Sequence, residues 1–353
     1  MSNDTMKAWV LTDKRKMELQ ERPMPKIKDN EVLIKIKAAG ICGSDLHFYT
    51  DCKIADYEMD PSKGQTLILG HECSGEIVAV GKNCKKSTVG DRVVVEPGIP
   101  CMKCDECRAG RYNFCHDMFF MGTYPWDGCM CEYVAWPEFL TYKMPDTMSY
   151  QLGAMIEPFV VGLQAMRNSG IGFSDNAVVV GCGAIGMMTI QALRSIGAGQ
   201  IIAIDLEPFK LDMAKKMGAD VVINPKECEN VAQAVRDLTD GYGAQYGFEC
   251  VGNDRTFWDI NTYVRDGGTV TYLGLLINDG TSMPMSSAVM RGLTYHTLIR
   301  YTNLFDRAMS MLELGRSDIL PVMTHEYDFD HAVEAYEKAL TDKQTSIKVM
   351  INF

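Results

Sequence analysis

The most specific chemical signal in the chain is a run of closely spaced cysteines, Cys101, Cys104, Cys107 and Cys115, with the spacing C-x2-C-x2-C-x7-C. Four thiolates this close together can surround one ion tetrahedrally, and zinc is the usual occupant of such a site. No coordination position would stay open, so the sequence predicts a structural zinc. An iron–sulfur cluster is the competing interpretation, and disulfides are disfavoured in a chain that shows no export signal.

A second motif, Gly181–Gly186, has the spacing G-x-G-x-x-G. It follows a predicted strand, Ala177–Val180, and opens a predicted helix, while Asp205 stands 19 residues after the motif at the end of the next strand. This context favours a dinucleotide site over an ordinary strand–helix turn, because the glycines admit the pyrophosphate and the acid meets the ribose. A carboxylate there would repel a 2′-phosphate, so we predict NAD. The predicted cofactor-binding residues are Gly181, Gly183, Ala184, Ile185, Gly186, Asp205 and Lys210.

A third group of residues is weaker when each is taken alone. Cys42 is a possible thiolate ligand, Gly70-His71-Glu72 begins 28 residues later, and Glu157 stands at a predicted domain junction. Each has an ordinary alternative, since a lone buried cysteine usually behaves as a small apolar side chain. Together, two or three such ligands plus water would form an open, catalytic zinc site.

Two kinds of structure must position these residues. The first 150 residues consist of short β segments separated by turn residues. The run 96–121 has no hydrophobic period, so we expect a bound metal to keep it ordered. From Gln151, apolar strands alternate with helix-length segments, which predicts an α/β, doubly wound parallel sheet. The predicted strands of that sheet are Asn176–Val180, Ile201–Asp205, Val221–Asn224, Tyr246–Glu249 and Thr269–Leu273; the helices between them are Ala184–Ser195, Pro208–Met217, Val231–Leu238 and Asp254–Val264.

Composition excludes several classes of protein. The chain has 353 residues and a formal net charge of −11, which disfavours nucleic acid and anionic membranes as partners. The longest nearly apolar run, Ala177–Ile190, is too short to span a bilayer. The 13 cysteines and the absence of a signal-peptide pattern favour a cytoplasmic location.

The segment Gly70-His71-Glu72-x2-Gly75-x5-Gly81-x2-Cys84 resembles the zinc signature of the medium-chain alcohol dehydrogenases. The four-cysteine run and the glycine motif stand where that family has them, and the resemblance covers essentially the whole chain. Within the family the chain is most similar to the polyol branch, the sorbitol (L-iditol) and xylitol dehydrogenases. The residues that carry this likeness are 41–47, Glu96-Pro-Gly, Gly110-Arg-Tyr-Asn, Ile156-Glu-Pro and Arg300-Tyr301-x-Asn303.

The resemblance implies a GroES-like, mostly β catalytic domain formed by residues 1–158 and 300–353, with a structural zinc lobe at 96–121. It implies a Rossmann NAD-binding domain at 159–299 and a homo-oligomer, either tetramer or dimer.

The resemblance also implies functional residues. The catalytic zinc ligands would be Cys42, His71 and Glu72, with Glu157 reaching the metal directly or through water and able to exchange roles with Glu72. The proton relay would be Ser44 and His47, and the substrate residues Phe119, Thr123, Arg300 and Tyr301.

The function implied is zinc-dependent oxidation of a secondary alcohol of a polyol to the ketose, with hydride transfer to NAD and two zincs per chain. Phe48, where the sorbitol enzymes carry Tyr, and the bulky Trp126 are departures that weaken the claim for sorbitol itself. Alternatives on the same scaffold are a cyclitol, amino-cyclitol or sugar-phosphate dehydrogenase. A threonine dehydrogenase is disfavoured by Arg300-Tyr301, and a remote alternative is a non-catalytic dinucleotide-binding relative.

Overall fold

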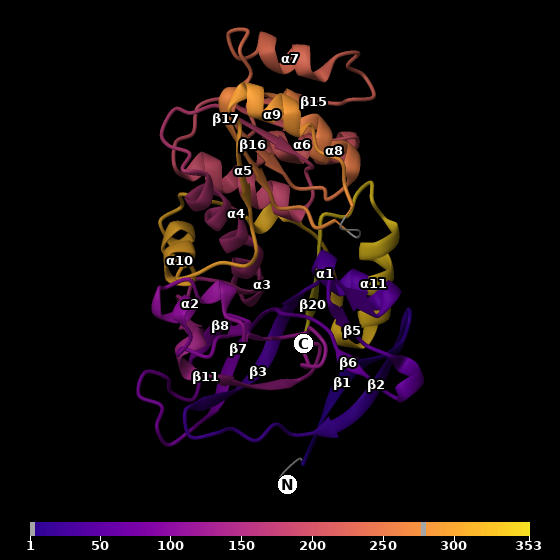
Figure 1. Ribbon diagram of the computed structural model, residues 1–353. Coiled ribbons are helices and arrows are strands. Elements are labelled where there is room, and N and C mark those ends of the chain that lie inside the picture. Colours follow the sequence, from indigo (N-terminus) through magenta and orange to yellow (C-terminus); the bar gives the residue numbers. More distant parts are fainter. Residues whose placement is uncertain (1–3, 277–279) are drawn as a thin grey trace. The chain divides into compact units, whose positions relative to one another are not determined.

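The computed structural model describes residues 4–276 and 280–353, which divide into two units (Figure 1). The first unit is Met1–Glu157 with Met323–Phe353, and the second is Pro158–Val322. The segment that follows Arg300, expected in the catalytic domain, thus stays in the second unit until Val322. A physical reason is that Thr302 bonds to that unit: its hydroxyl accepts from Arg167 Nη2 at 2.6 Å and its N–H donates to Gln164 Oε1 at 3.1 Å.

The central strand of the first unit is β3 (Glu31–Gly40). It pairs antiparallel with β7 (Glu72–Val80) along one side and with β11 (Tyr133–Pro137) and β20 (Lys348–Asn352) along the other. Outer strands β8 (Arg92–Val95) and β12 (Thr141–Lys143) extend the sheet beyond β7, and β19 (Met323–Asp328) extends it beyond β20. Gly40 is in register with both Glu72 and Met350, so the beginnings of β7 and β20 meet at the end of β3.

Smaller elements surround this sheet. Three short antiparallel sheets are formed by β1 (Thr5–Asp13), β2 (Lys16–Pro23) and β6 (Leu67–Ile68); by β4 (Lys53–Ile54) and β5 (Tyr57–Glu58); and by β9 (Gly98–Ile99) and β10 (Phe119–Phe120). The helices are α1 (Gly43–Asp51), α2 (Asp105–Arg108), α3 (Tyr150–Ala154) and α11 (Ala332–Thr341). One apolar core, including Ile34, Ile36, Phe48 and Tyr336, joins the N-terminal strands to the C-terminal segment.

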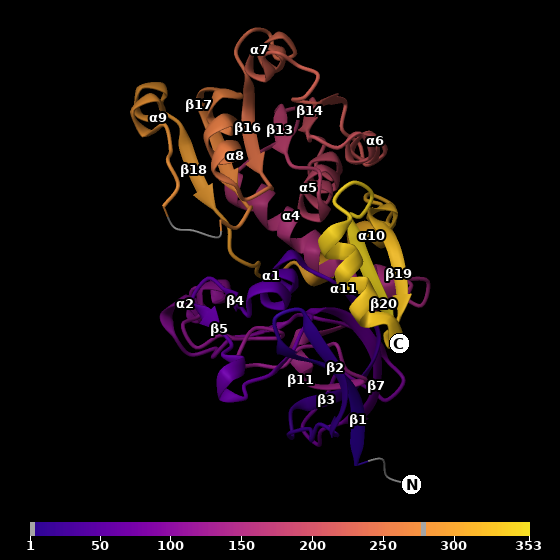
Figure 2. The ribbon, with the colours of Figure 1, turned by 90° about the vertical axis from the view of Figure 1, so that its right-hand side faces the viewer.

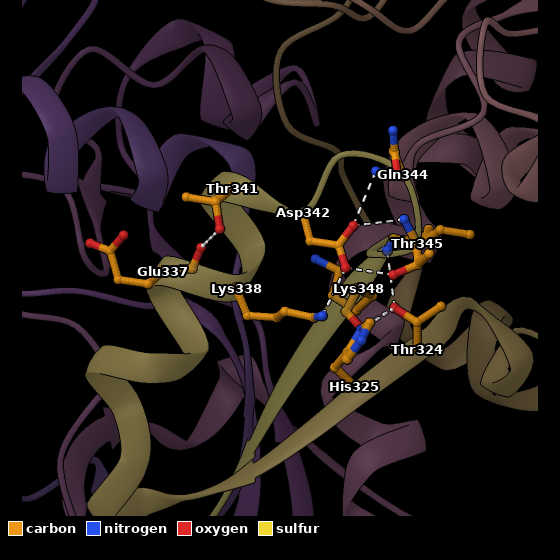
Figure 3. A network of polar contacts seen from close by, with 10 residues as sticks. Thr324, His325, Glu337, Lys338, Thr341, Asp342, Gln344, Thr345 and Lys348 are labelled. Carbon is orange, nitrogen blue, oxygen red and sulfur yellow. Dashed lines mark hydrogen bonds and ion pairs between the residues drawn. The ribbon is translucent and has the colours of Figure 1, made fainter.

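Helix α11 lies beside β20, and a compact turn joins the two (Figure 2). The Asp342 carboxylate accepts hydrogen bonds from the N–H groups of Gln344 at 3.1 Å and Thr345 at 2.8 Å, and it pairs with Lys338 at 2.8 Å (Figure 3). These bonds satisfy two backbone donors of the turn that runs from the end of α11 to the start of β20 at Lys348.

The second unit contains a six-stranded sheet in which every pair is parallel. Its strand order is β15 (Val221–Ile223), β14 (Ile201–Ile204), β13 (Ala177–Val180), β16 (Ala244–Glu249), β17 (Val264–Tyr272) and β18 (Thr294–Thr297). Chain order reverses between β13 and β16, which is the doubly wound topology that places ligands at the carboxyl ends of those two strands. The predicted fold class is therefore confirmed.

Four of the described helices of the second unit fall in the segments predicted above to be helical, whereas the helices Ile156–Ser169 and Met285–Arg291 were not predicted. The helices of this unit are α4 (Ile156–Ser169, which begins in the first unit), α5 (Ala184–Ser195), α6 (Pro208–Lys216), α7 (Val231–Asp237), α8 (Asp254–Asp259), α9 (Met285–Arg291) and α10 (Phe305–Glu313). The helix predicted to reach Val264 ends earlier, because Val264 pairs with Ala244 and opens β17. Strand β18, a Thr-Tyr-His-Thr segment, was not predicted because its apolar signal is weak. Among the described residues, no helix has the length and apolar character needed to cross a membrane.

Candidate active site

Cys42, His71 and Glu72 converge in the first unit, with their ligand atoms all within 4.8 Å of one another. Cys42 is the N-cap of α1, and the other two stand at the start of β7. The glycines beside them are required by space. A Cβ on Gly40 would lie 2.2 Å from Glu72 Oε2, and Gly70 has a φ of +91° and abuts Cys129 Sγ.

Asp45 ties two of these residues together, and sequence analysis did not identify it. One carboxylate oxygen accepts from Cys42 N at 2.9 Å; the other accepts from Gly70 N at 3.1 Å and lies 3.4 Å from His71 Nδ1. A carboxylate on the second ring nitrogen of a metal-binding histidine orients the ring and increases its basicity. The available signal was the acid three residues after the cap, a helix-capping pattern.

The charges of this group suit a cation. Burial alone would lower the pKa of His71, but the negative charges of Asp45 and Cys42 outweigh burial and raise that pKa well above its usual value. The site therefore favours a positive charge between these side chains. A zinc ion would supply that charge, and thiolate, imidazole and carboxylate are all ordinary zinc ligands.

Lys348, which sequence analysis also missed, pairs with Glu72. Its Nζ lies 2.7 Å from each carboxylate oxygen and 3.0 Å from the carbonyl oxygen of Ile41. Both side chains are almost fully buried, at 3% and 1% exposure. Burial lowers the pKa of Lys348, but the charge and hydrogen bond of Glu72, with the charges of Cys42 and Glu157, together outweigh burial and raise that pKa, so the lysine stays charged. A Glu72 oxygen that turned to a metal would have to share its charge with this ammonium.

The other predicted catalytic residues are Glu157, Ser44 and His47, and none of them belongs to the three-residue metal group. Glu157 is buried in the first turn of α4 and lies outside the three-residue set. Ser44 and His47 are half-buried on α1, one turn apart. Burial lowers the pKa of His47, so its imidazole is uncharged at neutral pH and able to accept a proton.

Phe119, one of the two predicted substrate residues of the first unit, lies among aromatic side chains. Phe119 turns to Trp126 and Trp136, with ring centroids 5.2 and 5.7 Å away. Its neighbour Phe120 is the ring that lies against His71, at 5.4 Å. Adjacent residues of a strand face opposite sides, so a shift of one position along β10 changes which phenylalanine borders the metal group.

Thr123 and Phe48, two positions singled out by the family resemblance, have different degrees of burial. Thr123 lies half-buried in the turn after β10, where its N–H donates to Phe120 O at 3.2 Å. Phe48 is 1% exposed and belongs to the core of the first unit.

The four cysteines predicted to bind structural zinc form the second potential metal group of the first unit. The sulfurs of Cys101 and Cys107 are 4.0 Å apart, close to the ~3.8 Å edge of a tetrahedron with ~2.3 Å zinc–sulfur bonds. The backbone N–H groups of Lys103 and Cys104 lower the pKa of Cys101 to about 6, which favours the thiolate that metals bind. The residues therefore fit a structural zinc.

A buried carboxylate anchors this cysteine lobe. Glu96 is 2% exposed and accepts hydrogen bonds from the hydroxyls of Tyr112, in the lobe, at 2.7 Å and Tyr142, on β12, at 2.6 Å. The lobe has only a small apolar cluster of its own, formed by Cys107, Cys115 and Met118. Glu96 thus provides a buried polar anchor where the lobe has little apolar core of its own.

The glycine motif in the second unit forms the turn between β13 and α5. Gly181 has a φ of +91°, and a Cβ on Gly186 would lie 1.8 Å from Gly181 O. Gly183 caps α5 and has open space where a Cβ would be, so a phosphate can approach its backbone. Ala184 and Ile185 form the first turn of that helix, whose free N–H groups bind anions.

Asp205, directly after β14, holds the motif in place. Its two oxygens accept from Cys182 N at 2.7 Å and Glu207 N at 2.9 Å. Lys210 is half-buried on α6, and its charge acts on Cys182, which the motif contains. A further residue that sequence analysis missed is Glu249, fully buried at the end of β16, which accepts from Val251 N and Gly252 N, both at 3.0 Å.

The predicted substrate residues Arg300 and Tyr301 belong to the second unit. Arg300 is half-buried with a φ of +53°, and Tyr301 is 3% exposed and packs edge-on against Phe305 at 5.5 Å.

Comparison with models of known protein families shows which family the chain belongs to. Residues 28–146 match the family model "Alcohol dehydrogenase GroES-like domain", and residues 184–314 match "Zinc-binding dehydrogenase". The chain belongs to the zinc-binding alcohol dehydrogenases. It is therefore an oxidoreductase with a zinc site and a nicotinamide dinucleotide fold, as predicted.

Individual relatives agree with this family. The dehydrogenase is 36% identical over 346 residues to a sorbitol dehydrogenase of Bacillus subtilis, covering 98% of this chain and 97% of the relative. It is 38% identical over 335 residues to a D-xylulose reductase of Morganella morganii, covering 95% and 97%. A solved Escherichia coli oxidoreductase/dehydrogenase of unknown specificity, described as involved in membrane biogenesis, matches with a TM-score of 0.93, 34% identity and 99% of both chains.

The buried pair in the dehydrogenase generates a stability prediction. Lys348→Met leaves the Glu72 carboxylate buried without its cation, so we expect the zinc-free protein to lose about 3–5 kcal/mol of unfolding free energy. Glu72→Gln combined with Lys348→Met removes both charges and should recover much of that loss. Urea unfolding of the two single variants and the double variant measures the coupling. A double variant no more stable than Lys348→Met would contradict a net electrostatic pairing.

Proposed function

We propose that this dehydrogenase oxidises a secondary alcohol of a polyol to the corresponding ketose and transfers the hydride to NAD. The observation that carries the proposal is the Cys42–His71–Glu72 group, a three-residue donor set that leaves a coordination position for a substrate oxygen. The names of the sorbitol dehydrogenase and D-xylulose reductase relatives support a polyol as the substrate class.

A zinc ion held by Cys42, His71 and either Glu72 or Glu157 would act as a Lewis acid that makes the substrate alkoxide accessible near neutral pH. Ser44 accepts the hydroxyl proton and passes it toward His47, whose uncharged imidazole can take it. The hydride passes to the nicotinamide from the carbon that carries this hydroxyl. The alcohol therefore loses two electrons and two hydrogens in all. Phe120 forms an apolar wall beside His71 and excludes water there.

The substrate's other hydroxyl groups need polar partners, and Arg300 is proposed as the main one. A guanidinium offers several donors and does not act as a base. Tyr301 and Thr123 are proposed as further substrate-binding residues. Phe119 is proposed to support substrate binding only indirectly, through its packing against Trp126 and Trp136.

An assembly of two or more copies is also proposed. Strand β18 is at the edge of the six-stranded sheet and, in the described part of the chain, pairs with β17 alone (Figure 2). The adjacent helix α9 exposes Val289 at 74% and Met290 at 86%. Exposed strand edges and apolar side chains are ordinarily covered, and a second copy of the chain would cover both. A dimer or tetramer in the cytoplasm is the form we propose.

A substrate panel tests the function. We expect NADH formation by the zinc-loaded enzyme with one or more four- to six-carbon polyols, and none with Cys42→Ala, which loses a metal ligand but retains the dinucleotide loop. Fluorescence titration with NADH should show that the variant still binds cofactor. If activity is found only with inositols, amino-cyclitols, sugar phosphates or threonine, that class replaces polyols as the proposed substrate. Full activity in Cys42→Ala would refute the metal mechanism.

Two zincs per chain are expected, one in each ligand group. Mild chelation should release the zinc of the Cys42 group first and abolish activity with the fold intact, because an open site exchanges more readily than a closed four-thiolate site. As a matched pair, Cys42→Ser should lose activity with little change in the thermal midpoint, whereas Cys104→Ser should lower the midpoint. Metal analysis finding one zinc in fully active enzyme would contradict this arrangement.

Cofactor choice should depend on the charge of Asp205. A 2′-phosphate within a few ångströms of the carboxylate costs roughly 1–4 kcal/mol at effective dielectrics of 20–80, or about tenfold to a thousandfold in kcat/KM against NADP. Asp205→Asn removes the charge and keeps one of the two oxygens that accept from the loop, so the preference for NAD should narrow. The matched control is Asp220→Asn, since Asp220 accepts from Ile201 N at 2.8 Å at the other end of β14. Equal or higher wild-type kcat/KM with NADP would overturn the assignment.

A further inference from the structure

Two acids stand at the ends of the strands that flank β13, and they differ in exposure. Asp205 follows β14 and Glu249 ends β16, and each accepts hydrogen bonds from two backbone N–H groups. Asp205 remains partly exposed, whereas Glu249 is 0% exposed. Asp205 can therefore meet a ligand directly, while Glu249 can act on a ligand only through the groups that it holds.

The side chain of Glu249 holds the turn that follows it. Its Oε1 accepts from Val251 N and Gly252 N, both at 3.0 Å, and its Oε2 lies 3.2 Å from Gly252 N. The Thr256 hydroxyl, on α8, donates to Oε1 at 2.6 Å. Because all of these partners are donors, they suit a carboxylate, which only accepts, better than an amide of the same size.

The main chain of Glu249 holds a second segment, the end of β17. Its carbonyl oxygen accepts from Leu273 N at 2.8 Å and from Gly274 N at 3.0 Å. The two segments are in close contact, since a Cβ on Gly274 would lie 2.2 Å from Gly252 N and 2.4 Å from Glu249 Oε2. Glu249 therefore fixes the turn after β16 and the end of β17 relative to each other.

The turn after β16 also borders the glycine motif. Cys250 N donates to Val180 O, at the end of β13, at 2.8 Å. A Cβ on Gly181 would lie 2.5 Å from Val251 Cγ2, so Val251 occupies the space beside the first glycine of the motif. Dinucleotides bind a doubly wound sheet at the carboxyl ends of the strands where chain order reverses, which here are β13 and β16. A shift of this turn would move one wall of that crevice.

We propose that Glu249 is a positioning residue for the dinucleotide. Its carboxylate keeps the turn 250–252 and the end of β17 in one arrangement, on the side of β13 opposite to Asp205. The proposal rests on the proposed function only in taking NAD as the cofactor. Groups that are ordered before the ligand arrives lower the entropy cost of binding, so loss of this order should weaken cofactor binding without disturbing the zinc ligands.

The variant Glu249→Gln in the zinc-loaded enzyme tests this, because the amide has one acceptor oxygen and places an NH2 group among donors. We expect the dissociation constant of NADH and the KM for NAD to rise about 5- to 30-fold, as expected for lost hydrogen bonds to a charged group. Zinc content should not change. The kcat at saturating NAD should also be unchanged, since an interaction lost equally from ground and transition states raises KM alone.

The matched control is Glu138→Gln. Glu138 is also a carboxylate that accepts from consecutive N–H groups, those of residues 85–87, but it belongs to the first unit. The control variant should lower the thermal midpoint and leave the dissociation constant of NADH unchanged. An unchanged NADH dissociation constant in folded Glu249→Gln would overturn the proposal, and so would an equal rise in Glu138→Gln.

A second measurement, hydrogen exchange in the wild-type enzyme, needs no variant. The amides of residues 251, 252, 273 and 274 should be protected before NADH is added, whereas the free N–H groups in the first turn of α5 should gain protection only on binding. Rapid exchange of the turn without cofactor would contradict the role of Glu249. A wild-type protein that binds no NADH would refute the proposed function and this proposal together. One that binds NADH but oxidises no polyol would refute only the substrate, and the binding assay would still decide the role of Glu249.

Discussion

Burying negative charge at the end of β3 is the constraint on which the first unit depends. Asp45 and Glu72 are each 1% exposed and lie beside the half-buried Cys42, and isolated buried charges are costly. Lys348 offsets part of this charge from within the chain. A zinc ion held by Cys42, His71 and Glu72 would offset more of it.

The need for a cation beside Glu72 is met by the C-terminal segment, which brings Lys348 to it. Residues 323–353 return to the first unit after the whole second unit has been built. Strand β20 enters beside β3 at Gly40, the residue that also faces Glu72 across the sheet. Helix α11 is held to the N-terminal segment by Glu337, which accepts from Tyr49 on α1 and from Arg15 between β1 and β2. The last strand is thus an integral part of the metal site, although it contributes no ligand.

What could be predicted from the sequence follows from how local each determinant is. The glycine motif and the four cysteines were recognisable because their function depends on spacing over a few residues, and the strand–helix alternation gave the parallel sheet. Asp45 was within reach, since its capping role is local to α1. Lys348 was not, because its meaning depends on a pairing across 276 positions of sequence. Phe119 and Phe120 show a finer limit: a motif identifies a short strand, but only the register shows which of two adjacent rings borders His71.

In the second unit, the carboxylate of Asp205 is held in place while it stays partly exposed. Asp205 uses one lone pair of each oxygen to hold the backbone of Cys182 and Glu207. Each oxygen retains capacity for one more donor, and a ribose offers two adjacent hydroxyls. The carboxylate is therefore oriented before cofactor arrives, by the same turn that shapes the pyrophosphate site. Because the side chain that holds the loop is also the one proposed to meet the ribose, replacing it by alanine would remove both loop bonds together with the charge, whereas asparagine, which has one acceptor oxygen, keeps one of the two loop bonds.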